Sequence, residues 1–180
     1  MNILKIPLNI LLDKNFIKVI DGIAGAGKSS ALHKILTDNE ISYLRATSTN
    51  KLKKDAMARY PECTCTTIAG GLFTTNFRDG GYYREYKDVE EDTIVIDEIL
   101  QSNAKVFQYC IDNIGKKNII ITTDSHQMLA PGQGIFILDE FKKFCEREDV
   151  YYVEITDTLR ARNPETKAIF EELYRSVDDE

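Results

Sequence analysis

The segment of this chain that most constrains its fold is the octapeptide at residues 22–29, Gly-Ile-Ala-Gly-Ala-Gly-Lys-Ser, which satisfies the pattern G-x-x-x-x-G-K-[ST]. An apolar run at 16–21 that predicts a strand precedes it, and a helical pattern over 28–37 follows. Between a strand and a helix, such glycines let backbone N–H groups converge on phosphate oxygens at the helix N-terminus, where the helix dipole favours anions. The octapeptide therefore predicts a phosphate-binding loop in an α/β fold, and an incidental glycine-rich turn is the less favoured alternative.

The residue types in this loop have expected contacts with a bound nucleotide. The Lys28 ammonium would reach the β and γ phosphates, and the Ser29 hydroxyl would ligate Mg²⁺. The residues expected to bind the phosphates are Gly25, Ala26, Gly27, Lys28, Ser29 and Ser30. A complex of Mg²⁺ and a nucleotide is thus the ligand that the loop predicts.

The rest of the chain alternates apolar runs with helical patterns. The predicted strands lie at 16–21, 41–47, 93–97, 118–123 and 151–155, and the predicted helices lie at 28–37, 51–60, 102–113, 135–147 and 165–176. Strands that read as continuous apolar runs and alternate with helices imply a parallel sheet covered on both faces. A length of 180 residues, 43% of them hydrophobic, fits one domain. The predicted fold class is α/β, a three-layer P-loop NTPase over residues 1–180.

Residues 70–92 depart from this alternation and predict an inserted β-hairpin. Asp79, Gly80 and Gly81 supply the positive φ angles that a tight turn needs. The aromatic residues that flank this turn are Phe73, Phe77, Tyr82, Tyr83 and Tyr86. Such rings either pack onto the sheet or stay free to contact a partner.

Composition excludes several classes of protein. The apolar runs are interrupted well short of the roughly 20 residues that span a bilayer, and no small-residue cleavage site follows the N-terminal apolar stretch. Cys63 and Cys65 form one C-x-C and Cys110 and Cys145 are isolated, which fits neither a paired zinc site nor a disulfide framework. The formal charge of −6 argues against a surface coated with positive charge but leaves a local basic groove open. We therefore expect a cytoplasmic protein with reduced cysteines and no membrane association.

Two further apolar runs end in polar residues. One ends in Asp97 and Glu98, of which Asp97 would hold the Mg²⁺ shell and Glu98 would polarise an attacking water. The other ends at Asp124 and is followed by Gln127, whose amide could sense the γ-phosphate. A solvated strand end and a turn cap are the respective alternatives. Because ligands bind beyond the carboxyl ends of strands in a parallel sheet, we expect these residues at the same edge as the octapeptide.

Together these motifs resemble the first RecA-like domain of a superfamily 1 helicase of the RecD/Dda type, from about residue 16 to residue 174. Residues 22–29 resemble motif I, 47–51 motif Ia, 66–68 the strand end that follows, 97–98 motif II, 123–128 with 131–134 motif III, and 155–160 motif IV. The chain departs from the family pattern at Thr123, Ala26 and Ala69, and no glutamine precedes Gln101 to read adenine.

The resemblance implies a function as well as a fold. It implies the N-terminal ATP-binding motor domain (domain 1A, motifs I to IV) of a DNA or RNA helicase, an ATP-dependent NTP phosphohydrolase that uses ATP and Mg²⁺. The catalytic residues would be Lys28, Glu98, Gln127 and Arg160, with Ser29 and Asp97 at the metal. Contacts with a single strand, DNA more than RNA, would come from Thr49, Asn50, Thr67, Phe77 and Tyr82.

The resemblance also implies a second RecA-like domain of the same polypeptide, absent from this chain, in a monomeric helicase. That domain would supply a further arginine, and an arginine finger is worth about 10³ to 10⁵ in rate. The chain alone should therefore bind nucleotide and hydrolyse it weakly. Two other functions stay open: a non-catalytic nucleotide-binding module, and a small P-loop nucleotide kinase whose lid would use Arg160, Arg162 and Arg175.

Overall fold

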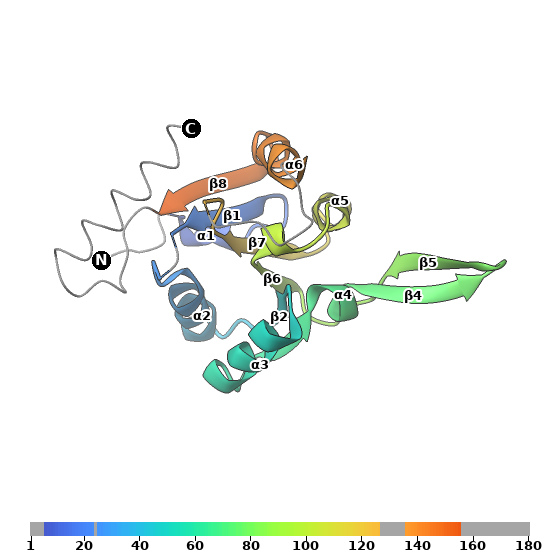
Figure 1. The fold of residues 1–180 in the computed structure, drawn as a ribbon. Helices are drawn as coiled ribbons and strands as arrows, with labels where there is room; N and C mark the ends of the chain where they lie inside the picture. The colour runs from blue at the N-terminus through green and yellow to red at the C-terminus, as the bar shows by residue number, and fades with distance from the viewer. Residues whose placement is uncertain (1–5, 24, 127–135, 156–180) are drawn as a thin grey trace.

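A computed structural model of the protein describes residues 6–23, 25–126 and 136–155, which form one large sheet with helices around it and one projecting hairpin (Figure 1). The large sheet has six strands in the order β3-β2-β6-β7-β1-β8, and every neighbouring pair is parallel. The strands are β1 (Ile17–Gly22), β2 (Tyr43–Thr47), β3 (Thr64–Thr67), β6 (Thr93–Asp97), β7 (Asn118–Thr123) and β8 (Val150–Ile155).

Helices cover both faces of this sheet. They are α1 (Leu8–Leu11), α2 (Lys28–Asp38), α3 (Asn50–Arg59), α4 (Ile68–Gly71), the 3₁₀ turn η1 (Ile99–Gln101), α5 (Lys105–Asp112) and α6 (Phe136–Cys145). Successive strand residues point to opposite faces, so Ile94 and Ile96 join the core with α5 and α6, whereas Val95 joins the core with α1 and α2. The three layers and the parallel sheet confirm the predicted α/β fold class. No helix within the described ranges is long and apolar enough to cross a membrane.

The strand register places the carboxyl ends of neighbouring strands in one row. Asp97 at the end of β6 is paired with Thr47 of β2 on one side and with Thr122 of β7 on the other. On the far side of β7, Thr123 is paired with Asp21 of β1. The polar residues that end these strands therefore lie side by side, at the edge from which the octapeptide loop leaves β1.

The predicted hairpin is present as β4 (Phe73–Arg78) and β5 (Gly81–Tyr86), which pair antiparallel and project from the rest of the molecule (Figure 1). Its two-residue turn has positive φ at both positions, 50° at Asp79 and 78° at Gly80, as a type I′ turn requires. At the root, the Tyr86 ring packs against Phe73 and Tyr109, with ring centroids 5.9 and 5.1 Å away. The root of the hairpin is thus held by aromatic packing on α5.

The tip of the hairpin behaves differently from its root. The side chains of Phe77 and Tyr82 are 64% and 80% exposed, and their rings contact each other with centroids 5.1 Å apart. They do not pack onto the sheet. Of the two alternatives for the hairpin aromatics, packing holds for the root and free rings for the tip.

Some elements differ from the predicted ones. The one-turn helices α1 and α4 were not expected, because short segments give little periodic signal. The strand β3 was expected only as the strand end at 66–68 that the family resemblance implies. The helix predicted at 102–113 begins only at Lys105, since the chain first makes the η1 turn. The helix predicted at 165–176 lies outside the described residues.

Candidate nucleotide site

The octapeptide joins β1 to α2, with Gly22 at the end of β1 and Lys28 and Ser29 in the first turn of α2. Gly25 and Gly27 have φ angles of 85° and 76°, in the left-handed region that glycine adopts without a steric cost. Gly27 is the N-cap of α2, so the N–H groups of the first helical turn come directly after the glycine turn. The local geometry is therefore that of an anion-binding helix N-terminus preceded by a glycine-rich turn.

Lys28 lies buried inside this loop, with 8% of its surface exposed. Its Nζ donates to the backbone oxygens of Gly22 and Ile23, the latter at 3.1 Å. Burial lowers the pKa of Lys28, and the charges of nearby carboxylates oppose that shift. These carboxylates belong to Asp124, Glu98, Asp21 and Asp97. Lys28 is thus a buried cation that interacts with four nearby carboxylates.

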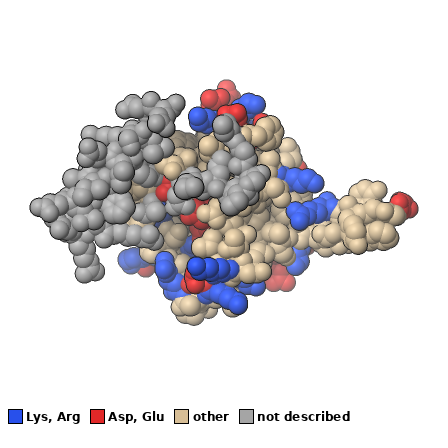
Figure 2. All heavy atoms as spheres, in the orientation of Figure 1, with Lys and Arg blue, Asp and Glu red and all other residues tan. Residues whose placement is uncertain are grey.

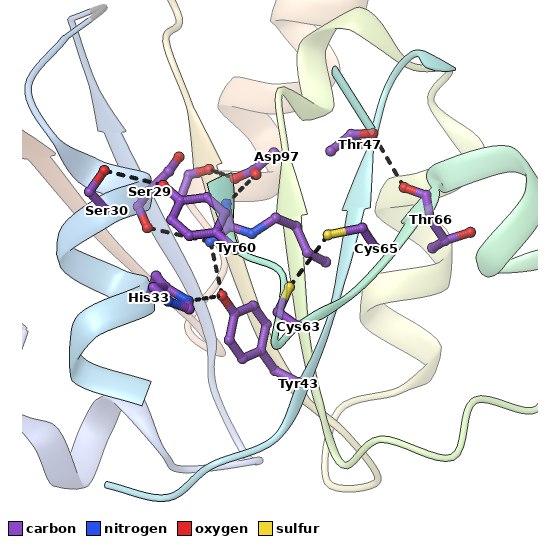
Figure 3. Close-up of polar contacts among 12 residues, drawn as sticks. Ser29, Ser30, His33, Tyr43, Thr47, Tyr60, Cys63, Cys65, Thr66 and Asp97 are labelled. Atoms are coloured by element: carbon purple, nitrogen blue, oxygen red, sulfur yellow. Dashed lines mark hydrogen bonds and ion pairs between the residues drawn. The ribbon is translucent and has the colours of Figure 1, made fainter. Parts of the chain in front are cut away.

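Asp97 is held through both carboxylate oxygens. The Thr122 hydroxyl donates to Oδ1, and Nη1 of Arg45 donates to Oδ2 at 2.5 Å. The same guanidinium reaches the backbone oxygen of Ser29 through Nη2 at 3.4 Å. Figure 3 shows Ser29, Asp97 and Tyr60 gathered at this point from α2, β6 and the end of α3.

The donors that Ser29 and Asp97 supply fit Mg²⁺. A hydroxyl and a carboxylate are hard oxygen ligands, and Mg²⁺ is usually bound through one or two carboxylates together with substrate phosphates. The two residues lie on either side of one guanidinium, at the edge where the loop lysine also lies. The residues present therefore suit the metal that the sequence predicted.

Glu98 combines a strained backbone with an unusual carboxyl group. Its φ of 57° and ψ of 49° are left-handed, a conformation that costs a non-glycine residue on the order of 1 to 2 kcal/mol. Its backbone N–H donates to the oxygen of Thr122 at 2.9 Å, which anchors the turn. Burial raises the pKa of Glu98 to about 7; Lys28 opposes this shift, and the neighbouring carboxylates add to it. A carboxyl that titrates near neutral pH is suited to proton transfer.

The other predicted residues fall into three groups. Thr49 follows β2 and Thr67 ends β3, so both lie at this edge. The Thr49 hydroxyl accepts from the Leu52 N–H and caps α3. The Thr67 hydroxyl accepts from the Gly70 N–H and caps α4. Asn50 is exposed at the first position of α3. The tip rings Phe77 and Tyr82 belong to the projecting hairpin, and Gln127 and Arg160 lie outside the described residues.

Asp124 is buried at the end of β7 and accepts from the backbone of His126 at 3.1 Å. That contact is the turn-capping role given as its alternative, and its charge also acts on Lys28. Asp21 is likewise buried and accepts from the Ser125 backbone at 2.9 Å and from the Tyr152 hydroxyl at 2.8 Å. These two carboxylates thus brace the loops beside the lysine.

Sequence reasoning missed Arg45 and Thr122, the two residues that hold Asp97. Arg45 carried a signal, because a charged residue within a strand buried along its whole length needs a partner. Thr122 carried none, since only the pairing of β6 with β7 brings its hydroxyl to Asp97.

The fold and the site together define a P-loop nucleotide-binding domain of the RecA-like type. Residues 18–162 match the family described as the viral superfamily 1 RNA helicase core domain. The chain belongs to that family, which confirms the superfamily 1 resemblance of its motifs. No curated protein sequence matches the chain.

Solved structures of Pif1 helicases share the fold. A Bacteroides Pif1 helicase in complex with ADP-AlF3 and single-stranded DNA superimposes with a TM-score of 0.58 at 18% identity, over 93% of this chain and 44% of that one. Unliganded Pif1 from Bacteroides gives 0.56 at 17% identity, over 92% and 43%. Two Pif1 helicases coordinating at forked double-stranded DNA give 0.55 at 19% identity, over 90% and 44%. The chain spans less than half the length of these Pif1 chains.

The raised pKa of Glu98 predicts a pH-dependent stability in protein freed of metal with EDTA. Between pH 4.5 and about 7 the folded protein holds a proton on Glu98 that the unfolded chain has released. Raising the pH through this window should therefore destabilise the wild type relative to Glu98→Gln, by about 2 to 3 kcal/mol in the free energy of unfolding. Urea unfolding at a series of pH values measures the difference, and parallel curves for the two proteins would contradict the assignment.

Proposed function

We propose that this chain is the N-terminal ATP-binding motor domain of a helicase, which couples hydrolysis of Mg-ATP to movement along a single strand when joined to a second RecA-like domain. The observation that carries the proposal is the convergence of Lys28, Asp97 and Glu98 at one edge of the sheet. The chain has the family and the fold of helicase motor domains. A nucleotide kinase and a non-catalytic module are the alternatives that the experiments below also address.

Each residue has a role that its surroundings support. Lys28 would exchange its two backbone acceptors for phosphate oxygens, and Ser29 and Asp97 would hold Mg²⁺, which neutralises phosphate charge when bound. Glu98 would take the proton from the attacking water, because its desolvated carboxyl titrates near neutral pH. The roles of Gln127 at the γ-phosphate and of Arg160 at the charge developing on it rest on motif resemblance and stay predictions.

The second RecA-like domain is part of this proposal. The chain spans 44% of the Bacteroides Pif1 helicase to which it is similar, which leaves room in a parent protein of similar size for a second motor domain. Closure of two such domains would bring a further arginine to the nucleotide, so we expect weak hydrolysis by this chain alone. The monomeric state and the cytoplasmic location also stay predictions.

We propose that the nucleic acid along which this domain moves, its track, is single-stranded DNA. A Bacteroides Pif1 with this fold binds it, whereas the family description names RNA helicases. On this chain, α3 carries the basic residues Lys51, Lys53, Lys54 and Arg59 directly after Thr49 and Asn50. Figure 2 shows Lys and Arg, interspersed with Asp and Glu, on the lower part of the molecule, where Figure 1 places α2 and α3, and further Lys and Arg elsewhere on this face. Phosphate contacts of this kind hold either nucleic acid, so the choice between them needs a direct measurement.

The first prediction of this proposal concerns nucleotide affinity. Lys28→Ala should weaken binding of a fluorescent ATP analogue about 10- to 100-fold, since a charge-assisted hydrogen bond contributes about 1.5 to 3 kcal/mol and each decade of affinity is about 1.4 kcal/mol. Lys34→Ala is the matched control: Lys34 lies on the same helix, 74% exposed, with its Nζ 2.7 Å from Asp38. Equal affinity in Lys28→Ala and Lys34→Ala would overturn the nucleotide site.

The second prediction concerns the track. Fluorescence anisotropy with end-labelled oligo(dT) and oligo(rU) of equal length should show tighter binding of the DNA, with affinity that falls as salt rises because phosphate contacts release counterions. Tighter binding of the RNA would instead indicate an RNA helicase, as the family description states. A protein that binds ATP but neither strand would favour the non-catalytic module or the kinase.

The third prediction concerns the hairpin tip, which we propose acts as a strand-separating pin. A free ring can stack on an unpaired base, worth about 1 to 3 kcal/mol. Changing Phe77 and Tyr82 together to alanine should cut duplex unwinding by the two-domain protein, while ATPase stimulated by single strands and the melting temperature stay near wild type. Unwinding is followed on a fluorescently labelled fork.

Tyr83→Ala is the control for this double variant. Tyr83 is 52% exposed and neighbours Tyr82, but successive strand residues point to opposite faces, so it leaves the Phe77–Tyr82 pair intact. The pin is refuted if the double variant unwinds as well as Tyr83→Ala does. A lowered melting temperature with parallel loss of both activities would show instead that the rings stabilise the fold.

A further inference from the structure

Arg45 is a buried charge that neither the motifs nor the proposed roles explain. It lies in the middle of β2 with 1% of its surface exposed, between Leu44 and Ala46, which belong to the hydrophobic core. Taking a guanidinium out of water costs several kcal/mol, and hydrophobic residues of similar volume often stabilise a fold at least as well. Packing alone therefore gives no reason for an arginine at this position.

Both arms of the Arg45 guanidinium reach the nucleotide site. One arm donates to Asp97 and the other to the Ser29 backbone oxygen, so the guanidinium joins the predicted metal ligand to the first turn of α2. Its Cζ lies over the rings of Tyr60 and Tyr43, 4.5 and 5.6 Å from their centroids, and Nη2 also donates to the Tyr43 hydroxyl at 3.3 Å. The rings and the hydroxyl thus hold the guanidinium in one orientation.

This orientation determines how Asp97 presents its carboxylate. Thr122 donates to one oxygen and Arg45 to the other, which fixes the rotation of the carboxylate plane. An ionised carboxylate has about four acceptor positions, so each oxygen keeps a lone pair after these two bonds. The Asp97 side chain stays 13% exposed, so part of it is open to solvent.

We propose that Arg45 is a positioning residue for the metal ligand Asp97: it holds the carboxylate turned so that its free lone pairs face a Mg-nucleotide complex. This inference rests on the proposed function and adds to it. It separates two parts of nucleotide affinity. The part that Lys28 contributes through the phosphates does not depend on Arg45, whereas the part that Mg²⁺ contributes through Asp97 does.

The test compares nucleotide affinity with and without the metal. A fluorescent ADP analogue is titrated into the wild type and Arg45→Met in Mg²⁺ and again in EDTA, and the ratio of the two Kd values is the readout. Arg45→Met should reduce the enhancement by Mg²⁺ about tenfold, the effect of losing one charge-assisted hydrogen bond, and leave the Kd in EDTA within about twofold. Arg45→Lys keeps the charge but not the fork, so it should restore part of the enhancement.

A double-mutant cycle tests whether the effect passes through Asp97. In an Asp97→Asn background, Arg45→Met should change the ratio no further, because the ligand that it positions is already lost. Thr122→Val removes the other donor to Asp97 and should lower the enhancement in the same selective way. If circular dichroism shows that Arg45→Met does not fold, Thr122→Val is used in its place.

Several results would overturn the inference. An unchanged ratio in folded Arg45→Met, or an equal loss of affinity in Mg²⁺ and EDTA, would show that Arg45 only supports the fold. Tighter binding in Mg²⁺ would show that the guanidinium repels the metal. If the wild type gains nothing from Mg²⁺, this inference fails; if Lys28→Ala also leaves affinity unchanged, the nucleotide site itself fails.

Discussion

Parallel pairing of β2, β6 and β7 in one register is the constraint on which the site depends. It puts Asp97 between Thr47 and Thr122, and it lets the backbone of Glu98 bond to the next strand as the chain turns away. A slip of one residue would send the carboxylate of Asp97 to the opposite face of the sheet. The buried isoleucines of β6 and β7 hold that register, so the hydrophobic core is what positions the polar edge.

Charges of both signs lie on this edge, most of them out of water. Lys28 faces the carboxylates from the loop side, and Arg45 reaches Asp97 from within the sheet. Neighbouring carboxylates repel one another in a medium of low dielectric, and the charges of the two cations offset this repulsion. Burial of Glu98 outweighs the opposing charge of Lys28, and the pKa of its carboxyl rises to about 7. The same edge therefore holds one carboxylate, Asp97, in a fixed orientation by hydrogen bonds, and raises the pKa of its neighbour Glu98.

The sequence allowed the sheet, the loop and the hairpin to be predicted because each has a local signal: apolar runs, spaced glycines, and Asp-Gly at a turn. Asp97 and Glu98 were predictable as the polar end of such a run. The contacts that orient them were not, since Thr122 meets Asp97 only through strand pairing and the stack of Arg45 on Tyr60 joins β2 to the end of α3. The β3 edge strand gave no periodic signal, because its residues, Thr64 to Thr67, are mostly polar and partly exposed, and only the family resemblance placed a strand end there.

The left-handed backbone of Glu98 sets stability against activity in this domain. Glycine takes that conformation freely and asparagine more readily than most residues, so either would relieve strain that glutamate sustains. Selection for thermal resistance alone would favour these replacements and would remove the carboxyl group from the site. A domain stabilised in this way would lack the carboxyl group that we propose as the general base, so an engineer who stabilises the domain must leave this position strained.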